Sequence, residues 1–142
     1  DLRQEQMQVG CLAGRTGERI PMSEVKKLVV VLGQNANDDK STVAFTIANA
    51  ALSTGMQVAV FLTSDGVELA RDGCYDMTHV QPFKTLHELV DTFVEKGGIV
   101  WACAPCYRHR GLKEAENVEK IQVTGAGPLI EWVQQGAATI SL

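Results

Sequence analysis

Short, uninterrupted runs of apolar residues recur along most of the chain, and segments with helical spacing separate them. Runs of this length, with no polar residue at alternate positions, are typical of strands that are covered on both faces of a sheet. Strands of this kind are expected over 27–33, 57–62 and 99–103, and two further strands are expected over 121–124 and 137–142.

The segments between these runs carry apolar residues every three or four positions, which indicates helices. The clearest helix begins at Asp38 or Asp39 and ends before Gly55, and a second covers 85–95. Shorter helices are expected over 64–71, from 105 towards 111, over 113–117 and over 128–135. Strands that alternate with helices predict right-handed β-α-β units. We therefore expect a three-layer α/β/α domain with a five-stranded, mainly parallel sheet, whose strand order the pattern does not give.

Length and composition indicate one folded domain. The chain has 142 residues, 45% of them hydrophobic, which is enough for a real core. Residues 24–142 are expected to form this domain, and the polar, glycine-containing segment 1–23 is expected to be a flexible arm.

Charge and hydropathy argue against several classes of function. A formal net charge of −4 leaves no basic surplus for binding nucleic acid. No apolar run approaches the roughly 18 residues of a membrane span, and the first residues lack the apolar stretch of a secretory signal. The four cysteines, Cys11, Cys74, Cys103 and Cys106, do not have the spacing of a small disulfide-rich scaffold. We therefore expect a cytoplasmic protein with reduced thiols.

The motif Cys103-Ala-Pro-Cys106 carries the strongest chemical signal, because it lies where the strand 99–103 ends and a helix begins. A thiol at a helix N-terminus faces unpaired N–H groups, so we expect a lowered pKa and a reactive thiolate at Cys103. Pro105 suits the first turn of the helix. The carboxyl ends of parallel strands are also where ligands bind in such sheets.

Several kinds of chemistry fit this motif. The thiolate can accept a sulfane sulfur and pass it on as a persulfide, or the pair can cycle through a disulfide. Metal binding is weaker, because Cys103, Cys106 and His109 supply at most three local ligands and no second C-x-x-C motif exists. Two inert, buried thiols are the structural alternative.

The segment Trp101-Ala-Cys103-Ala-Pro-Cys106-Tyr-Arg-His-Arg110-Gly111 resembles the DsrE/DsrF/TusD-like family of small sulfur-relay proteins, which includes YchN-like proteins. Cys103 and Arg110-Gly111 fall on the positions of the sulfur-carrying cysteine and the Arg-Gly pair of that family. The resemblance extends over about 26–142 and includes the alanine-rich segment 43–51 and the segment 61–70. Cys106 is a departure, because single-cysteine carriers need only one thiol.

This resemblance implies a sulfur-relay protein that forms homo-oligomers, often trimers or hexamers, with partner proteins that donate and accept sulfur. Cys103 would be the nucleophile and persulfide carrier, and Cys106 a resolving or assisting thiol. The alternatives are a thiol-disulfide oxidoreductase that uses the same pair and a non-catalytic oligomeric binding protein. Because many relatives of this fold have no established activity, enzymatic turnover does not follow from the family.

Other residues are candidates for lining the site. Arg110 is expected to stabilise the sulfur anion, and Asp65, Gly66 and Asn35 could line a pocket near Cys103, although capping and turn formation also explain these residue types. Cys74 lies in a loop and is more simply a partly buried thiol than an auxiliary sulfur site, and Cys11 lies in the arm. No cofactor or metal is expected: the segment Gly125-Ala-Gly127 lacks the third glycine of a dinucleotide-binding loop.

Overall fold

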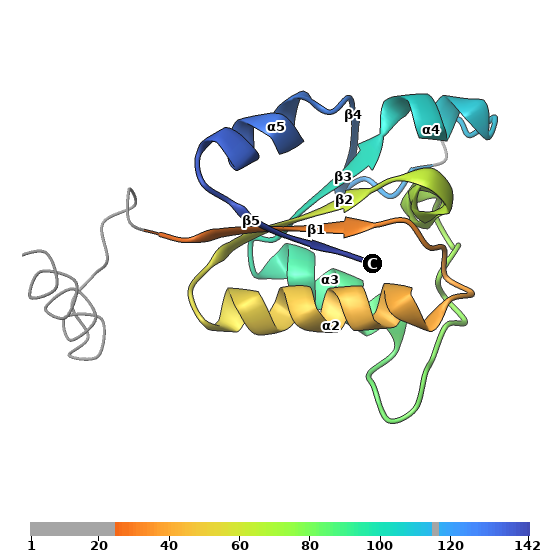
Figure 1. Cartoon of the computed structure of the whole chain (residues 1–142). Coiled ribbons are helices and arrows are strands. Elements are labelled where there is room, and N and C mark those ends of the chain that lie inside the picture. Colours follow the sequence, from red (N-terminus) through yellow and green to blue (C-terminus); the bar gives the residue numbers. More distant parts are fainter. Residues whose placement is uncertain (1–24, 115–116) are drawn as a thin grey trace, which may run out of the picture.

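The computed structural model describes residues 25–114 and 117–142. Five strands form one sheet in the order β4-β3-β2-β1-β5, and every neighbouring pair of these strands is parallel (Figure 1). The strands are β1 (Lys27–Leu32), β2 (Gln57–Leu62), β3 (Ile99–Cys103), β4 (Ile121–Thr124) and β5 (Ala138–Ser141). The predicted five-stranded parallel sheet is confirmed.

Helices cover both faces of this sheet. Helices α2 (Asp39–Ser53) and α3 (Leu86–Glu95) lie against one face, and α5 (Gly127–Gln134) lies on the other (Figure 1). Helix α4 (Ala104–His109) follows β3 directly. The expected helix over 64–71 is a 3-10 helix, η2 (Ser64–Ala70). The expected turn of helix over 113–117 lies partly outside the described residues, because it includes positions 115–116. The expected arm 1–23 lies wholly outside them.

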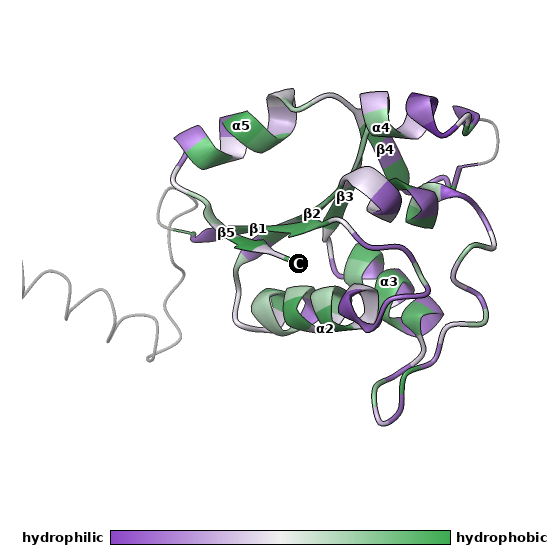
Figure 2. Cartoon of the chain, turned by 45° about the vertical axis from the view of Figure 1, so that its right-hand side comes forward, coloured by the Kyte–Doolittle hydropathy of each residue, from purple (hydrophilic) through white to green (hydrophobic). Residues whose placement is uncertain are grey.

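Side-chain alternation along the strands divides the core between the two faces. Leu28, Val30 and Leu32 of β1 join the larger cluster, which includes Phe45 of α2 and Phe93 of α3 with ring centroids 5.8 Å apart. Figure 2 shows the hydrophobic colour of the strands between the two helical layers.

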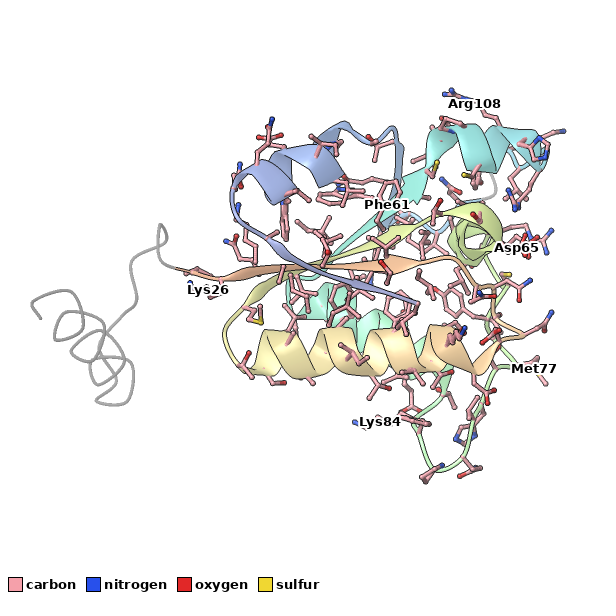
Figure 3. All side chains as sticks on the ribbon, viewed as in Figure 1. Lys26, Phe61, Asp65, Met77, Lys84 and Arg108 are labelled. Atoms are coloured by element: carbon pink, nitrogen blue, oxygen red, sulfur yellow. The ribbon has the colours of Figure 1, made fainter. Side chains whose placement is uncertain are left out.

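The second face of the sheet has a smaller cluster. Val29, Ala59, Phe61 and Trp101 are buried there, and Trp101 meets Trp132 of α5 edge to face with ring centroids 5.4 Å apart. Phe61 lies between β2 and α5 in Figure 3. No residue of α5 is fully buried, so this helix covers its face incompletely. Within residues 25–114 and 117–142, every helix is too short or too polar to traverse a bilayer.

The parallel arrangement brings the carboxyl ends of β1, β2 and β3 to one edge of the sheet. The segments that follow these strands begin at Gly33, Thr63 and Ala104. Figure 3 shows Asp65 at this edge and Lys26 at the opposite one. The cysteine motif therefore lies beside the start of η2.

Candidate functional site

Cys103 and Cys106, called the cysteine pair below, lie where β3 passes into α4. Cys103 is the last residue of β3 and the N-cap of α4, and Pro105 occupies the first turn of that helix. Both thiols are free and partly buried, and both pack against the larger core cluster. The sequence prediction that the motif joins a buried strand to a helix is confirmed.

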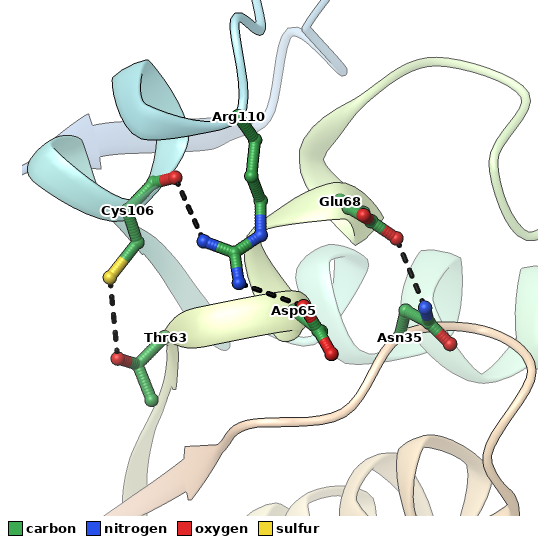
Figure 4. Close-up of polar contacts among 6 residues, drawn as sticks. All are labelled: Asn35, Thr63, Asp65, Glu68, Cys106 and Arg110. Carbon is green, nitrogen blue, oxygen red and sulfur yellow. Dashed lines mark hydrogen bonds and ion pairs between the residues drawn. The ribbon is translucent and has the colours of Figure 1, made fainter.

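Cys106 has the more polar surroundings of the two thiols. Its Sγ lies 3.7 Å from the Thr63 hydroxyl, which comes from the end of β2 (Figure 4). The pKa of Cys106 is lowered by hydrogen bonding with the Cys103 thiol, then by the Ser64 backbone N–H and the Thr63 hydroxyl. The positive charge of Arg110 lowers it further. These donors stabilise the thiolate, which is the nucleophilic form.

The expected low pKa of Cys103 is wrong in direction. Burial raises the pKa of Cys103, and hydrogen bonding between its side chain and Cys106 adds to that rise. The backbone N–H of Cys106 and the charge of Arg110 oppose it without overcoming it. Helix α4 has only six residues, so few peptide dipoles add up at its N-terminus. The groups that stabilise a thiolate surround Cys106 instead: the Cys103 thiol and, from the start of η2, Ser64 and Thr63.

Arg110 connects the end of α4 to η2 at this edge. One of its Nη atoms donates to the Cys106 carbonyl at 3.2 Å, and the other donates to Asp65 Oδ1 at 2.7 Å (Figure 4). Asp65 raises the pKa of Arg110, which stays a cation. The guanidinium thus lies beside the sulfur site while its hydrogen bonds go to a carbonyl and a carboxylate. Of the predicted binding residues, Arg110 and Asp65 are brought together here.

Gly66 and Asn35 are engaged in other contacts. A Cβ added to Gly66 would lie 2.3 Å from the Leu32 carbonyl oxygen, so this glycine lets η2 approach β1 closely. The Asn35 amide donates to Glu68 of η2 at 3.1 Å (Figure 4). The contacts of both residues hold the η2 segment in place, and a direct binding role for either stays a prediction.

Thr63 and Ser64 were missed by the sequence analysis. Ser64 has a φ of 51°, the one positive φ at a non-glycine position in the described part of the chain. This conformation is unfavourable for a residue with a Cβ, and such positions gather at functional sites. The only available sequence signal was the position of Thr63-Ser64 at the carboxyl end of a buried strand.

Cys74 is not among the groups that shift the pKa of Cys103 or Cys106. Burial raises the pKa of Cys74, and the charged groups that affect it are Arg71, Glu68 and Asp76. Cys11 falls outside the described residues. Among the described residues, no group of three His, Cys, Asp or Glu side chains could hold a metal ion. A pocket of about 390 Å³ is lined by Lys27, Gln57 and other residues at the amino ends of the strands, so it contains neither thiol of the pair.

The fold and the site together define a class: small parallel α/β proteins with a cysteine at the carboxyl end of the third strand. The chain belongs to the DsrE/DsrF-like family, whose sequence model matches residues 26–142. It is 30% identical over 107 residues to an uncharacterised protein from Methanopyrus kandleri, over 75% of this chain and 85% of the relative. An uncharacterised protein from Methanocaldococcus jannaschii is 27% identical over 111 residues, over 78% of this chain and 94% of the relative.

Solved structures show the same fold. The ychN protein from E. coli is 15% identical, with a TM-score of 0.68 over 83% of this chain and 99% of that one. A protein of unknown function from Methanobacterium thermoautotrophicum is 21% identical, with a TM-score of 0.60 over 82% of this chain and 99% of that one. At these identities the similarity establishes the architecture alone.

Proposed function

We propose that the chain is a sulfur-relay protein that accepts a sulfane sulfur, holds it as a persulfide on Cys103 and passes it to an acceptor thiol. Membership of the DsrE/DsrF-like family supports sulfur chemistry, since that family is associated with sulfur relay. The single observation that carries the proposal is the pair of free, partly buried thiols at the carboxyl edge of the sheet, one of them beside the donors Thr63 and Ser64.

Two features of the site fit a carrier. Transfer between thiols needs a thiolate and an accessible sulfur, and Cys106 and Cys103 are partly exposed side by side. The proposed partners are proteins that donate and accept sulfur as persulfides. Free thiols persist in a reducing compartment, so a cytoplasmic location is part of the proposal.

The chain is also proposed to form homo-oligomers, as trimers or hexamers. Ile130 and Val133 of α5 are 51% and 43% exposed, and Ile140 on the edge strand β5 is 37% exposed. Exposed apolar side chains on an incompletely buried helix support contact with another copy. Light scattering should report more than one chain, and Val133→Lys should lower the mass; a monomeric wild-type protein would contradict the proposal.

The relay proposal is tested by treating the reduced protein with a polysulfide and mapping the products by mass spectrometry. The expected product gains about 32 Da, one sulfur atom, and the added sulfur maps to Cys103. Cys103→Ser should lose the added sulfur at position 103, while Cys74→Ser, which changes the thiol outside the pair, should retain it there.

A second outcome separates the alternative function. Because the two thiols are adjacent, the pair could cycle through a disulfide as a thiol-disulfide oxidoreductase. Loss of two hydrogens with no sulfur adduct at any time would favour that activity. If both thiols alkylate no faster than a free cysteine and no adduct forms, the non-catalytic binding protein is the better description.

A further inference from the structure

The two thiols of the pair are not equivalent. Cys106 Sγ meets the Thr63 hydroxyl at 3.7 Å and interacts with the Ser64 backbone N–H, both from the junction of β2 and η2. Cys103 packs against both clusters of the core. The Thr63 hydroxyl and the Ser64 N–H therefore both reach the second cysteine of the motif, whereas the donor beside the first is the backbone N–H of Cys106.

The backbone around Ser64 is shaped for this contact. Its φ of 51° costs roughly 1 kcal/mol or more for a residue with a side chain. The neighbouring turn is closed by Gly66 N–H donating to the Thr63 carbonyl at 2.9 Å. The close approach of Gly66 to Leu32 fixes the same turn against β1. A rigid turn thus holds the Thr63 hydroxyl and the Ser64 N–H beside Cys106.

We infer that Cys106, rather than Cys103, is the thiolate that takes the sulfane sulfur from a persulfide donor, and that the sulfur then moves to Cys103. This inference rests on the proposed relay function and assigns the order of its steps. It makes Cys106 the main first acceptor of sulfur instead of an accessory thiol.

Two substitutions at sulfur complete the transfer. The Cys106 thiolate attacks the outer sulfur of a donor R–S–SH, an S–S bond forms at Cys106, and the donor S–S bond breaks with its electron pair on R–S⁻. The released thiolate takes the Cys103 proton and becomes R–SH. The Cys103 thiolate then attacks the outer sulfur on Cys106, and the electron pair of the breaking S–S bond returns to Cys106. The sum is R–S–SH plus Cys103 thiol giving R–SH plus Cys103 persulfide, with no net oxidation.

The unequal acidity of the pair gives this sequence its direction. A thiol of lower pKa is the better leaving group, and a thiol of higher pKa is the stronger nucleophile once it is deprotonated. The pKa of Cys106 is lowered and that of Cys103 is raised. The Cys106 thiolate is therefore the better leaving group when its outer sulfur is attacked, and the persulfide is expected to accumulate on Cys103.

The order is tested with glutathione persulfide, rapid quenching and peptide mapping of each thiol. In Cys103→Ser, sulfur should still load onto Cys106 at close to the wild-type initial rate and stay there. In Cys106→Ser, and in Cys106→Ala as a second variant, loading of Cys103 should slow by about tenfold or more, because the accepting thiolate is gone. Loading of Cys103 at the wild-type rate in both Cys106 variants would overturn the inference.

A hydroxyl deletion tests the donors without removing sulfur. Thr63→Val should slow the first loading step severalfold and raise the pH at which Cys106 alkylates. Thr46→Val is the matched control, because the Thr46 hydroxyl bonds only the Thr42 carbonyl in its own helix at 2.8 Å. Equal effects of the two variants would contradict the assigned role of Thr63.

Failure of the relay function itself gives a different result. If no donor ever adds sulfur to either thiol, the proposed function fails, whatever the alkylation profiles show. If sulfur reaches Cys103 but does so independently of Cys106, the relay stands and only the order is wrong. Release of sulfide with formation of a Cys103–Cys106 disulfide would show attack on the inner sulfur and would also overturn the second step.

Discussion

The Arg110 guanidinium donates to Asp65 Oδ1 at 2.7 Å and thereby links the end of α4 to η2 beside the cysteine pair. Its second contact, at 3.2 Å, is to the carbonyl of Cys106. Arg110 therefore both positions the backbone that carries Cys106 and places a positive charge near its sulfur.

Replacing this guanidinium should weaken the Cys106 thiolate. Because Arg110 lowers the pKa of Cys106, Arg110→Gln should raise that pKa and slow alkylation of Cys106 at neutral pH by roughly threefold. Arg110→Lys, which keeps the charge, should recover most of the rate if charge is the dominant effect. The measurement is the iodoacetamide rate at each thiol, followed by peptide mass spectrometry.

Arg108 offers the control for this prediction, since it is an exposed cation on the same short helix. Arg108→Gln changes the net charge equally and should leave the Cys106 rate unchanged. The free energy of unfolding should change little in either variant. Even the Arg110–Asp65 ion pair contributes little to it, because the Asp65 side chain is 60% exposed. Equal slowing in Arg108→Gln would indicate a general effect of net charge.

Strands such as β1 could be predicted because runs such as Leu28-Val29-Val30 have no polar residue at alternate positions, and all three residues are buried. Their parallel arrangement follows from the alternation of strands with helices. These runs do not show which face of the sheet each side chain packs against, because the residues on both faces are apolar. Strand order also could not be derived, because helical crossovers of similar length permit several orders.

The chemistry of the site was only partly readable. The position of Cys103 and the participation of Arg110 follow from local sequence. Cys103 and Arg110 are local partners of Cys106, but Thr63 and Ser64, which also stabilise its thiolate, lie some forty positions earlier, and only the fold brings them to the sulfur. The local sequence predicted a low pKa for Cys103 because it shows that a helix begins there. It does not show that the Cys103 side chain is partly buried, and burial raises the pKa.

Gly66 should be intolerant of any side chain. A Cβ at this position would lie 2.3 Å from the Leu32 carbonyl oxygen, which belongs to the backbone of the interior strand β1 and cannot move aside easily. Gly66→Ala should lower the free energy of unfolding by roughly 2–4 kcal/mol through overpacking. Gly125→Ala, where nothing lies within 4 Å of the added Cβ, is the control and should change it little. Urea denaturation provides both values, and equal midpoints would refute the packing explanation.

Thr42 carries a buried hydroxyl that should cost stability. It is 0% exposed, and its Oγ1 has no hydrogen-bond partner among the described residues. Thr42→Val replaces that hydroxyl with a methyl group of similar size, so the free energy of unfolding should rise by about 1 kcal/mol. Thr46→Val in the same helix removes a hydroxyl that bonds the Thr42 carbonyl and should give no gain. A loss of stability in Thr42→Val would show that the hydroxyl has a partner.

Tyr75 should give the protein an alkaline limit. It is 4% exposed, and burial, followed by the charges of Asp91, Asp76 and Asp72, raises its pKa from 10.0 to about 12. Between those two pH values the unfolded chain loses the phenolic proton while the native protein keeps it. Unfolding is therefore favoured as pH rises, and the contribution that is complete below pH 10 is lost by about pH 12.

The Tyr75→Phe variant isolates that contribution, because phenylalanine keeps the ring and cannot ionise. Between pH 10 and 12 the wild-type protein should lose about 2 kcal/mol more stability than Tyr75→Phe does. Urea midpoints across this range measure the difference, and the ultraviolet absorbance of tyrosinate reports the ionisation directly. Parallel pH profiles for the two proteins would mean that neither burial nor the acidic neighbours raise the pKa of Tyr75, because a phenol with an ordinary pKa ionises equally in the native and unfolded states.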